Sequence, residues 1–296
     1  KLTADAAAAR LDGVQASIDA AALADADLVI EAVFEDLDVK RAVFAQAAQA
    51  ARPDAILATN TSYLDPEAIF AGVPGPERCI GLHFFSPAQV MRLLEIVPIK
   101  ATAPAVLATG FALARAMNKV PVRAGVCDGF IGNRILKVVR AQAERLLLAG
   151  ASPTKVDAAM RAFGLPMGPF EAQDLGGLDI AAFQRKAARE RGETPFAPVA
   201  ERLCAIKRFG QKTGGGWYGY APGDRKPRAS VEVEHIIAAA AKEAGSKFHP
   251  LDEGTIQRAI VLPMVNEGAK ILAERVALRA SDVDLVKILG YGFPRW

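Results

Sequence analysis

The sequence predicts an α/β fold in which an open sheet of largely parallel strands is followed by all-α domains. Two observations carry this prediction. Over residues 1–122, short apolar segments alternate with segments of helical periodicity, which is typical of strands joined by crossover helices. After Gly129 the helical patterns follow one another, and nothing between residues 150 and 205 resembles a strand.

The first part of the chain reads as alternating helices and strands. Alanine-rich residues 3–23 have helical spacing, and the apolar run 27–34, bounded by acidic residues, predicts a buried parallel strand. We expect further strands at 55–59, 78–84, 93–97 and 119–122, and helices at 38–51, 66–71 and 103–117. This order of elements predicts a sheet covered by helices.

The rest of the chain reads as helices. An apolar helix over 131–149 stops at Gly150, and Ser152-Pro153 supplies an N-cap and a first-turn proline for the next helix. A glycine-rich stretch at 210–220 and a polar linker at 221–229 precede a second helical unit. We therefore expect domains at 1–122, 123–221 and 222–296. The helix carrying Asn133 and Glu144 resembles the segment 256–274, which suggests an internal duplication.

Composition excludes several classes of function. The chain has 296 residues, of which 51% are hydrophobic and 23% charged, with a formal net charge of only +3. No basic cluster interleaved with aromatic residues suggests nucleic-acid binding, and no apolar run approaches the ~20 residues that cross a bilayer. Cys79, Cys127 and Cys204 are widely spaced in apolar surroundings, so we interpret them as reduced core thiols rather than metal ligands.

Both ends of the sequence look cut. A dinucleotide-binding fold normally opens with a strand followed by a Gly-x-Gly-x-x-Gly turn. No such combination is found, since the Gly214–Gly216 run follows no strand. Without that turn, a pyrophosphate has no helix N-terminus to bind. One alternative is therefore an inactive piece with a structural or dimerisation role.

His83 is the candidate base. Oxidation of an alcohol needs a group that accepts a proton, and imidazole titrates near neutral pH. His83 ends an apolar strand, where open α/β sheets bind ligands, although a half-buried structural histidine is the commoner use. Glu95 lies within the next strand, where a carboxylate needs a partner. It could orient His83, or form a salt bridge with Arg92 or a lysine.

Other polar residues lie at element ends. Asn60-Thr61-Ser62 follows a strand and could simply cap the next helix. Asn133 faces an apolar stripe early in its helix. Glu35 and Lys40 flank the end of the first strand, where an ion pair at a solvated helix start is the simpler interpretation.

Together these segments resemble the 3-hydroxyacyl-CoA dehydrogenase family, and the resemblance covers essentially the whole chain. The matching motifs, in chain order, are Glu31-Ala32-Val33-Phe34-Glu35 with Lys40, Asn60-Thr61-Ser62, Gly81-Leu82-His83-Phe84-Phe85-Ser86-Pro87, Leu94-Glu95-Ile96-Val97, Gly129-Phe130-Ile131-Gly132-Asn133-Arg134, Gly164-Leu165-Pro166-Met167-Gly168-Pro169 and Lys212-Thr213-Gly214. The resemblance implies an incomplete Rossmann-like NAD-binding domain and helical domains like the C-terminal part of 6-phosphogluconate dehydrogenase.

The resemblance also implies roles for individual residues. His83 would be the general base and Glu95 its partner, while Ser62 and Asn133 would hold the hydroxyl and thioester region of an acyl-CoA substrate. The residues implied to line NAD are Val33, Phe34, Glu35, Lys40, Ser62, Ser86 and Lys212. Ser86 stands where the family usually has asparagine. No metal is implied.

The residues after Tyr220 resemble the multifunctional enzymes of fatty-acid β-oxidation, in which an enoyl-CoA hydratase module precedes the dehydrogenase. The close alternative is a stand-alone short-chain 3-hydroxybutyryl-CoA dehydrogenase, and we expect it to end near Tyr220. Among protein partners, a thiolase or a second copy of the chain fits this context. The alanine-rich composition favours a bacterial cytoplasm and leaves a peroxisome or a mitochondrial matrix open.

Overall fold

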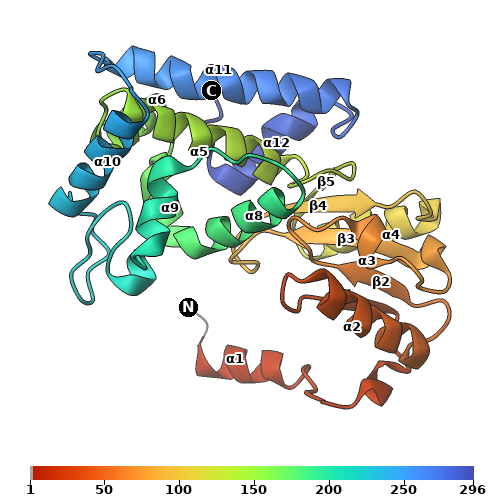
Figure 1. The fold of residues 1–296 in the computed structure, drawn as a ribbon. Coiled ribbons are helices and arrows are strands. Elements are labelled where there is room, and N and C mark those ends of the chain that lie inside the picture. The colour runs from red at the N-terminus through yellow and green to blue at the C-terminus, as the bar shows by residue number, and fades with distance from the viewer. Residues whose placement is uncertain (1–2) are drawn as a thin grey trace. The chain divides into compact units, whose positions relative to one another are not determined.

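A computed structural model describes residues 3–296 and divides the chain into two compact units (Figure 1). Unit 1 comprises residues 1–86 and 94–126, and unit 2 comprises residues 87–93 and 127–296. Unit 1 contains all five strands apart from the first residue of β4, and unit 2 contains helices α5 to α12. The domain boundary expected after residue 122 lies near the end of unit 1 at residue 126, and the domain bounds stay a prediction.

The sheet of unit 1 has the strand order β1-β2-β3-β4-β5. The strands are β1 (Leu28–Glu31), β2 (Ile56–Thr59), β3 (Cys79–Phe84), β4 (Leu93–Pro98) and β5 (Val120–Arg123). β1 pairs with β2 and β2 with β3 in parallel, whereas β3 and β4 are antiparallel. The reversal follows from the short connection between β3 and β4, because a parallel pair would need a crossover of a dozen or more residues.

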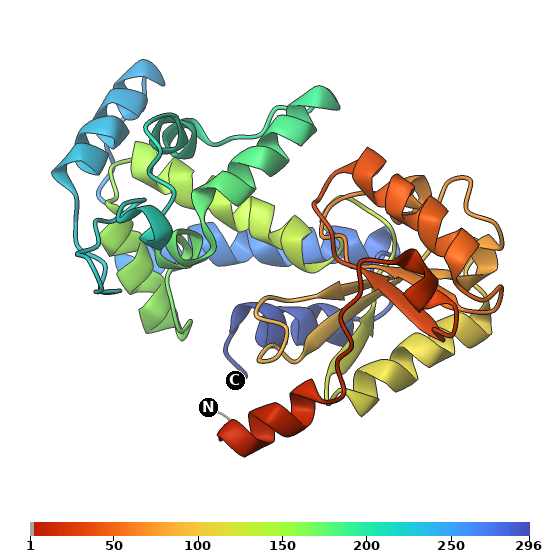
Figure 2. The ribbon, with the colours of Figure 1, turned by 90° about the horizontal axis from the view of Figure 1, so that it is seen from below.

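The two faces of the sheet carry separate cores. The ribbon shows helices on both sides of the sheet (Figure 2). Helix α2 (Leu37–Ala50) covers one face, where Phe44 packs with Leu57 of β2. Helix α4 (Pro104–Ala116) covers the other face, where Ala114 packs near Ala58. Leu57 and Ala58 are neighbours in β2 and point to opposite faces, as strand geometry requires. The shorter helices of unit 1 are α3 (Pro66–Ile69), η1 (Ala20–Leu23) and η2 (Pro76–Arg78).

The helical spacing over residues 3–23 produces helix in only part of that range. Helix α1 (Ala4–Leu11) is short, and a separate 3-10 turn begins at Ala20. Gly13 and the β-branched Val14 interrupt the helical pattern, and Asp19 starts a new turn by accepting a hydrogen bond from Ala21 N–H. Because α1 buries none of its residues, no packing compensates for these interruptions.

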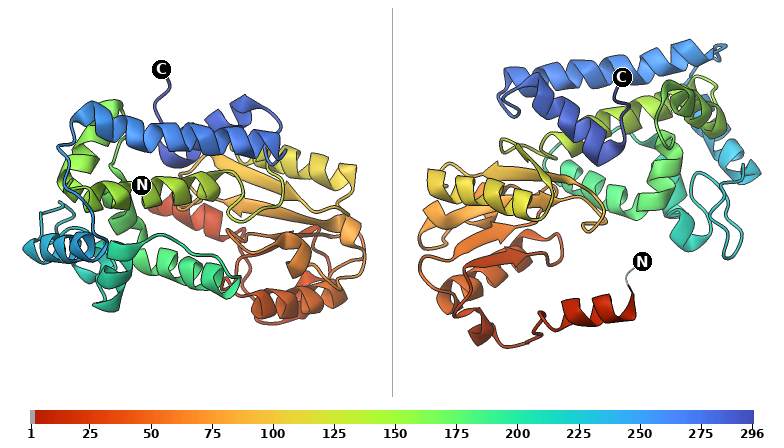
Figure 3. Two further views of the ribbon diagram at one scale, coloured as in Figure 1. Left: turned by 45° about the horizontal axis from the view of Figure 1, so that its top comes forward. Right: turned by 180° about the vertical axis from the view of Figure 1, so that it is seen from behind.

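Unit 2 is a helical assembly, as expected (Figure 3). Its members are α5 (Gly132–Leu148), α6 (Pro153–Phe163), α7 (Pro169–Gly176), α8 (Leu178–Glu190), α9 (Pro198–Ala205), η3 (Gln211–Thr213), α10 (Val231–Glu243), α11 (Glu253–Ala273) and α12 (Ala280–Tyr291). Helix α11 packs along α5, and Arg134 of α5 forms ion pairs with Glu267 and Glu274. The two segments that suggested a duplication therefore contact each other, while the duplication itself stays a prediction.

Two buried aspartates hold the glycine-rich stretch 210–220. Asp174 accepts hydrogen bonds from the Trp217 and Tyr218 N–H groups at 2.8 and 3.0 Å, and from the Tyr220 hydroxyl at 2.9 Å. Asp157 accepts one from the Tyr218 hydroxyl at 2.7 Å. Burial raises the pKa of Asp157 to about 7 and the pKa of Asp174 to about 6. The two aspartates therefore hold this glycine-rich stretch in place within unit 2.

Candidate active site

Polar side chains replace the apolar core where β1, β2 and β3 end. Leu57 and Cys79 lie side by side in the register and belong to the core under α2. Two residues further on, Glu31 and Thr59 lie opposite each other, and His83 follows on the same face of β3. The carboxyl ends of parallel strands are where open α/β sheets bind ligands. This edge of unit 1 is therefore the candidate site.

His83 and Glu95 form a buried pair across β3 and β4. They face each other in the antiparallel register, and His83 Nδ1 lies 2.7 Å from Glu95 Oε2. His83 is 4% exposed and Glu95 is 0% exposed. Opposite an ionised carboxylate, which only accepts hydrogen bonds, Nδ1 would carry the ring proton and the lone pair of a neutral ring would be at Nε2. Of the two explanations for Glu95, the structure thus shows the pairing with His83.

Lys40 is buried in an ion pair with Glu31. Its Nζ lies 2.6 Å from Glu31 Oε1 and 3.3 Å from Glu35 Oε2, and Lys40 is only 1% exposed. Glu31 also accepts hydrogen bonds from the Thr59 hydroxyl and the Val33 N–H, both at 2.7 Å. Lys40 does form the expected ion pair with Glu35. The interpretation that this pair is solvated is wrong, because the amphipathic helix α2 directs the Lys40 side chain inward.

Glu35 organises the loop after β2. Its Oε1 accepts hydrogen bonds from the Thr61 hydroxyl at 2.6 Å and from the Ser62 and Tyr63 N–H groups at 2.8 and 3.0 Å. Burial would raise the pKa of Glu35, but these hydrogen bonds and the charge of Lys40 together hold the pKa below its usual value. The carboxylate thus fixes the backbone that presents Ser62.

The loop after β2 is also tied to the end of β3. Asn60 Oδ1 accepts a hydrogen bond from Phe84 N–H at 2.9 Å, next to His83. Helix α3 is capped by Asp65, which accepts a hydrogen bond from Glu67 N–H at 2.8 Å. The alternative that residues 60–62 cap this helix is therefore wrong, and the hydrogen bonds place them at the same sheet edge as His83.

Three further candidates of unit 1 are exposed. Val33 and Phe34 follow β1 and are 41% and 69% exposed, and Ser86 is exposed just after β3. Apolar side chains so exposed beside a polar cluster offer a surface for a flat ring of a ligand.

The two remaining candidates lie in unit 2. Asn133 lies in the first turn of α5, where its Oδ1 accepts a hydrogen bond from the Tyr291 hydroxyl at 2.9 Å. Lys212 lies in η3 with its Nζ 2.6 Å from a carboxylate oxygen of Asp179. Its side chain is 49% exposed. Within unit 2, both positions present polar groups at the ends of helical segments.

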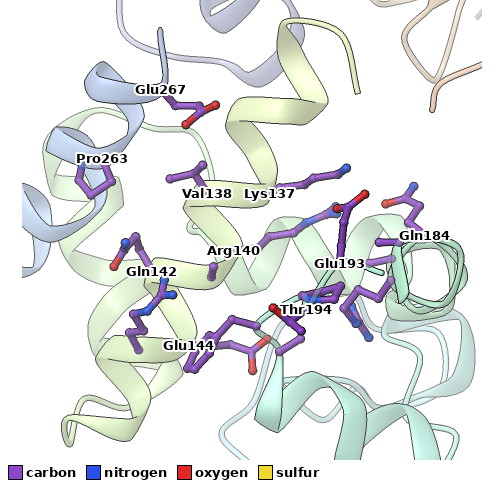
Figure 4. Close-up of a pocket in the computed structure, with 18 of the residues that line it drawn as sticks. Lys137, Val138, Arg140, Gln142, Glu144, Gln184, Glu193, Thr194, Pro263 and Glu267 are labelled. Carbon is purple, nitrogen blue, oxygen red and sulfur yellow. The ribbon is translucent and has the colours of Figure 1, made fainter. Parts of the chain in front are cut away.

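Unit 2 also contains a pocket of about 500 Å³ lined by residues of α5, α8 and α11 (Figure 4). Figure 4 shows Lys137, Arg140 and Glu144 along α5 in its wall. None of the predicted site residues lines it. Glu144 accepts hydrogen bonds from the Val199 and Ala200 N–H groups, so it caps the N-terminus of α9, and burial raises its pKa to about 7.

Sequence reasoning assigned no role in the site to several residues of these networks: Glu31, Thr59, Asn60, Thr61 and Tyr291. Glu31 carried a usable signal, since an acid inside an apolar strand needs a buried partner. The sequence around Thr61 and Tyr291 gave no signal of their contacts, because their partners Glu35 and Asn133 are 26 and 158 residues away in the chain.

His235 and His249 are exposed, and Cys79, Cys127 and Cys204 are in no disulfide, with Cys79 buried and the other two half-buried. Among residues 3–296, no group of three or more His, Cys, Asp or Glu side chains could hold a metal ion. Within the same range, every helix is too short or too polar to cross a membrane.

Two family models match the chain in sequence. Residues 1–127 match the NAD binding domain of 3-hydroxyacyl-CoA dehydrogenase, and residues 129–220 match the C-terminal domain of the same family.

Curated proteins and solved structures are similar over nearly the whole chain. The peroxisomal bifunctional enzyme of Cavia porcellus is 39% identical over 287 residues, which are 92% of this chain and 40% of that protein. The Escherichia coli 3-hydroxybutyryl-CoA dehydrogenase has a TM-score of 0.83 at 30% identity, covering 99% of this chain and 78% of that one. The dehydrogenase part of multifunctional enzyme 1 from C. elegans has a TM-score of 0.70 at 32% identity, covering 99% and 67%. The chain spans about 40% of the length of the curated relatives it matches.

Proposed function

We propose that this chain, which belongs to the 3-hydroxyacyl-CoA dehydrogenase family, oxidises (3S)-3-hydroxyacyl-CoA to 3-ketoacyl-CoA with NAD in a multifunctional β-oxidation enzyme. The observation that carries the proposal is the buried His83–Glu95 pair at the carboxyl end of the sheet. A carboxylate at 2.7 Å from Nδ1 prepares the imidazole to accept a proton at Nε2.

The proton moves to His83. Its Nε2 takes the proton of the C3 hydroxyl as the C3–H bond breaks, and the C3–O bond becomes a carbonyl. The imidazolium that forms lies next to the Glu95 carboxylate, which stabilises the positive charge in a site nearly closed to water. In the reverse reaction, the same imidazolium returns the proton to the carbonyl oxygen.

Ser62 and Asn133 are assigned to the substrate. Ser62 is presented by the loop that Glu35 and Asn60 tie to the end of β3. A hydroxyl and an amide can hold the substrate hydroxyl and the thioester oxygen, and thereby align C3 for reaction. In this proposal, Asn133 of unit 2 completes the set.

The residues at the ends of β1 and β2 fit a nicotinamide cofactor. Val33 and Phe34 expose apolar surface, while Glu35 and Ser62 supply polar groups beside it. NAD, when bound, accepts the hydride from C3. Ser86 and Lys212 would contact it as well. Lys40 would act by holding Glu35 in place, since it is itself buried.

A short-chain 3-hydroxybutyryl-CoA dehydrogenase is the second candidate. The E. coli enzyme of that name matches 99% of this chain, so the residues beyond Tyr220 do not separate the two functions. Turnover of 3-hydroxyacyl-CoA substrates of increasing acyl length separates them. A kcat/KM that falls steeply beyond four carbons favours the short-chain enzyme, and one that rises favours β-oxidation of longer chains.

Titration with NADH tests whether this chain supports the chemistry. We expect saturable quenching of protein fluorescence by NADH, and turnover when 3-ketoacyl-CoA is added. A chain that bound no NADH would support the alternative of an inactive structural piece. A thiolase or a second copy as partner, and a bacterial cytoplasm as location, stay predictions from the sequence; the relative from Cavia porcellus is named as a peroxisomal enzyme.

A further inference from the structure

Tyr291, the last residue of α12, reaches the start of α5. Its hydroxyl donates a hydrogen bond to Asn133 Oδ1 at 2.9 Å. Both residues belong to unit 2, although 158 positions separate them in the sequence. The proposed substrate-binding asparagine is therefore held by a residue from the far end of the chain.

The Tyr291 ring is fixed by its surroundings. A Cβ atom added to Gly132 would lie 2.8 Å from both Cε2 and the hydroxyl oxygen of Tyr291, so only glycine at position 132 admits the ring here. The ammonium group of Lys287 lies 4.4 Å from the ring centroid. The ring therefore has little freedom, and its hydroxyl occupies a defined position beside Asn133.

The hydrogen bond fixes where the Asn133 amide lies. An asparagine amide has an accepting end, Oδ1, and a donating end, Nδ2. In the structure the Tyr291 hydroxyl donates to Oδ1, so that Nδ2 is directed away from Tyr291. A tyrosine hydroxyl can also accept a hydrogen bond, so the contact holds the place of the amide rather than excluding the flipped orientation.

We propose that Tyr291 is a positioning residue for the dehydrogenase reaction, which holds the Asn133 amide in place so that Nδ2, at its far end, donates a hydrogen bond to the acyl-CoA substrate. The inference rests on the proposed function, because it takes Asn133 as a substrate ligand. It assigns the helical segment after residue 222 a part in the reaction: α12 supplies the hydroxyl, and a chain ending near Tyr220 would lack it.

The test is a double-mutant cycle in the full chain with Tyr291→Phe, Asn133→Ala and the double variant. Phenylalanine keeps the ring over Gly132 and removes only the hydroxyl. Because one hydrogen bond is worth about 0.5–1.5 kcal/mol, we expect Tyr291→Phe to lower kcat/KM about three- to tenfold. Binding of acetoacetyl-CoA without cofactor, measured by calorimetry, should weaken by a similar factor. The double variant should be no worse than Asn133→Ala alone.

Tyr218→Phe is the matched control. It removes the same hydroxyl from a buried tyrosine of unit 2, and its lost partner is Asp157. We expect lower thermal stability with unchanged kcat/KM. Gly132→Ala is a second route to the same effect, because the new methyl group must displace the Tyr291 ring. It should reproduce the loss seen in Tyr291→Phe.

The outcomes separate this inference from the proposed function. If Asn133→Ala lowers kcat/KM while Tyr291→Phe does not, or if the two losses multiply in the double variant, the positioning role is wrong and the proposed function stands. If Asn133→Ala leaves both kcat/KM and acetoacetyl-CoA binding unchanged, Asn133 is no substrate ligand, and both assignments fall.

Discussion

Replacing Lys40 by methionine tests whether this residue is a structural ion-pair partner or a direct cofactor ligand. The change removes a buried ammonium group 2.6 Å from Glu31 and leaves the Glu31 carboxylate, which has no exposed side-chain surface, with hydrogen bonds from Thr59 and Val33 N–H only. Removing one partner of a buried ion pair typically costs about 3–5 kcal/mol of folding stability, because the charge of the other partner stays buried. We expect Lys40→Met to lower the free energy of unfolding of unit 1 by about this amount.

Urea unfolding followed by circular dichroism measures the loss, with NADH titration on the folded fraction as the second readout. Lys100→Met is the matched control, because Lys100 is an exposed lysine of unit 1, and its replacement should change stability by at most about 0.5 kcal/mol. The double variant Glu31→Gln/Lys40→Met should recover part of the loss, since no charge then remains unpaired. A stability change under about 1 kcal/mol together with a large loss of NADH affinity would refute the reasoning and make Lys40 a direct ligand.

Three further predictions follow from the contacts. Glu95→Gln removes the charge that stabilises the imidazolium at His83, so kcat should fall about 10²-fold or more with substrate affinity kept, and an unchanged kcat would contradict the pairing. The pKa values of Asp157 and Asp174 are raised by burial to about 7 and about 6, so folding favours their protonated forms; their contribution to stability is full below pH 4 and is lost as pH rises to 7. Calorimetry between pH 4 and 7 should therefore show a shallower fall of stability for Asp157→Asn than for the unchanged chain, and parallel curves would contradict the assignment. Gly168→Ala would place a Cβ 2.2 Å from Asp157 Cβ, so its Tm should drop by several degrees, and an unchanged Tm would show that the α6–α7 contact yields easily.

The contact between His83 and Glu95 could be predicted because its geometry is local in the sheet. His83 ends one strand and Glu95 lies within the next, and two strands joined by a short connection pair in antiparallel fashion. A buried carboxylate opposite a buried imidazole is then the arrangement that satisfies both. From the sequence alone, a salt bridge to Arg92 or a lysine was as good an explanation of Glu95 as a pairing with His83. The strand register shows the pairing with His83.

The supporting contacts could not be predicted from pattern alone. The charge of Lys40 suggested a solvated position, and its burial depends on which face of α2 meets the Glu31 carboxylate. The contact between Tyr291 and Asn133 depends on how α12 packs against α5, and no local periodicity encodes a pairing over 158 residues. The helical spacing over residues 3–23 was misleading for a different reason. A helical composition without a surface to pack against does not sustain a helix.

The most direct test of the central claim is the rate constant of the His83→Gln variant for oxidation of a (3S)-3-hydroxyacyl-CoA at saturating NAD. Glutamine keeps a polar side chain of similar size beside Glu95 but cannot accept the hydroxyl proton. With His83 as the base, kcat should fall about 10²–10⁴-fold, while the dissociation constants of NADH and 3-ketoacyl-CoA stay within a few-fold of those of the unchanged chain. A variant that kept its turnover would show that another group takes the proton, and the assignment of His83 would be wrong.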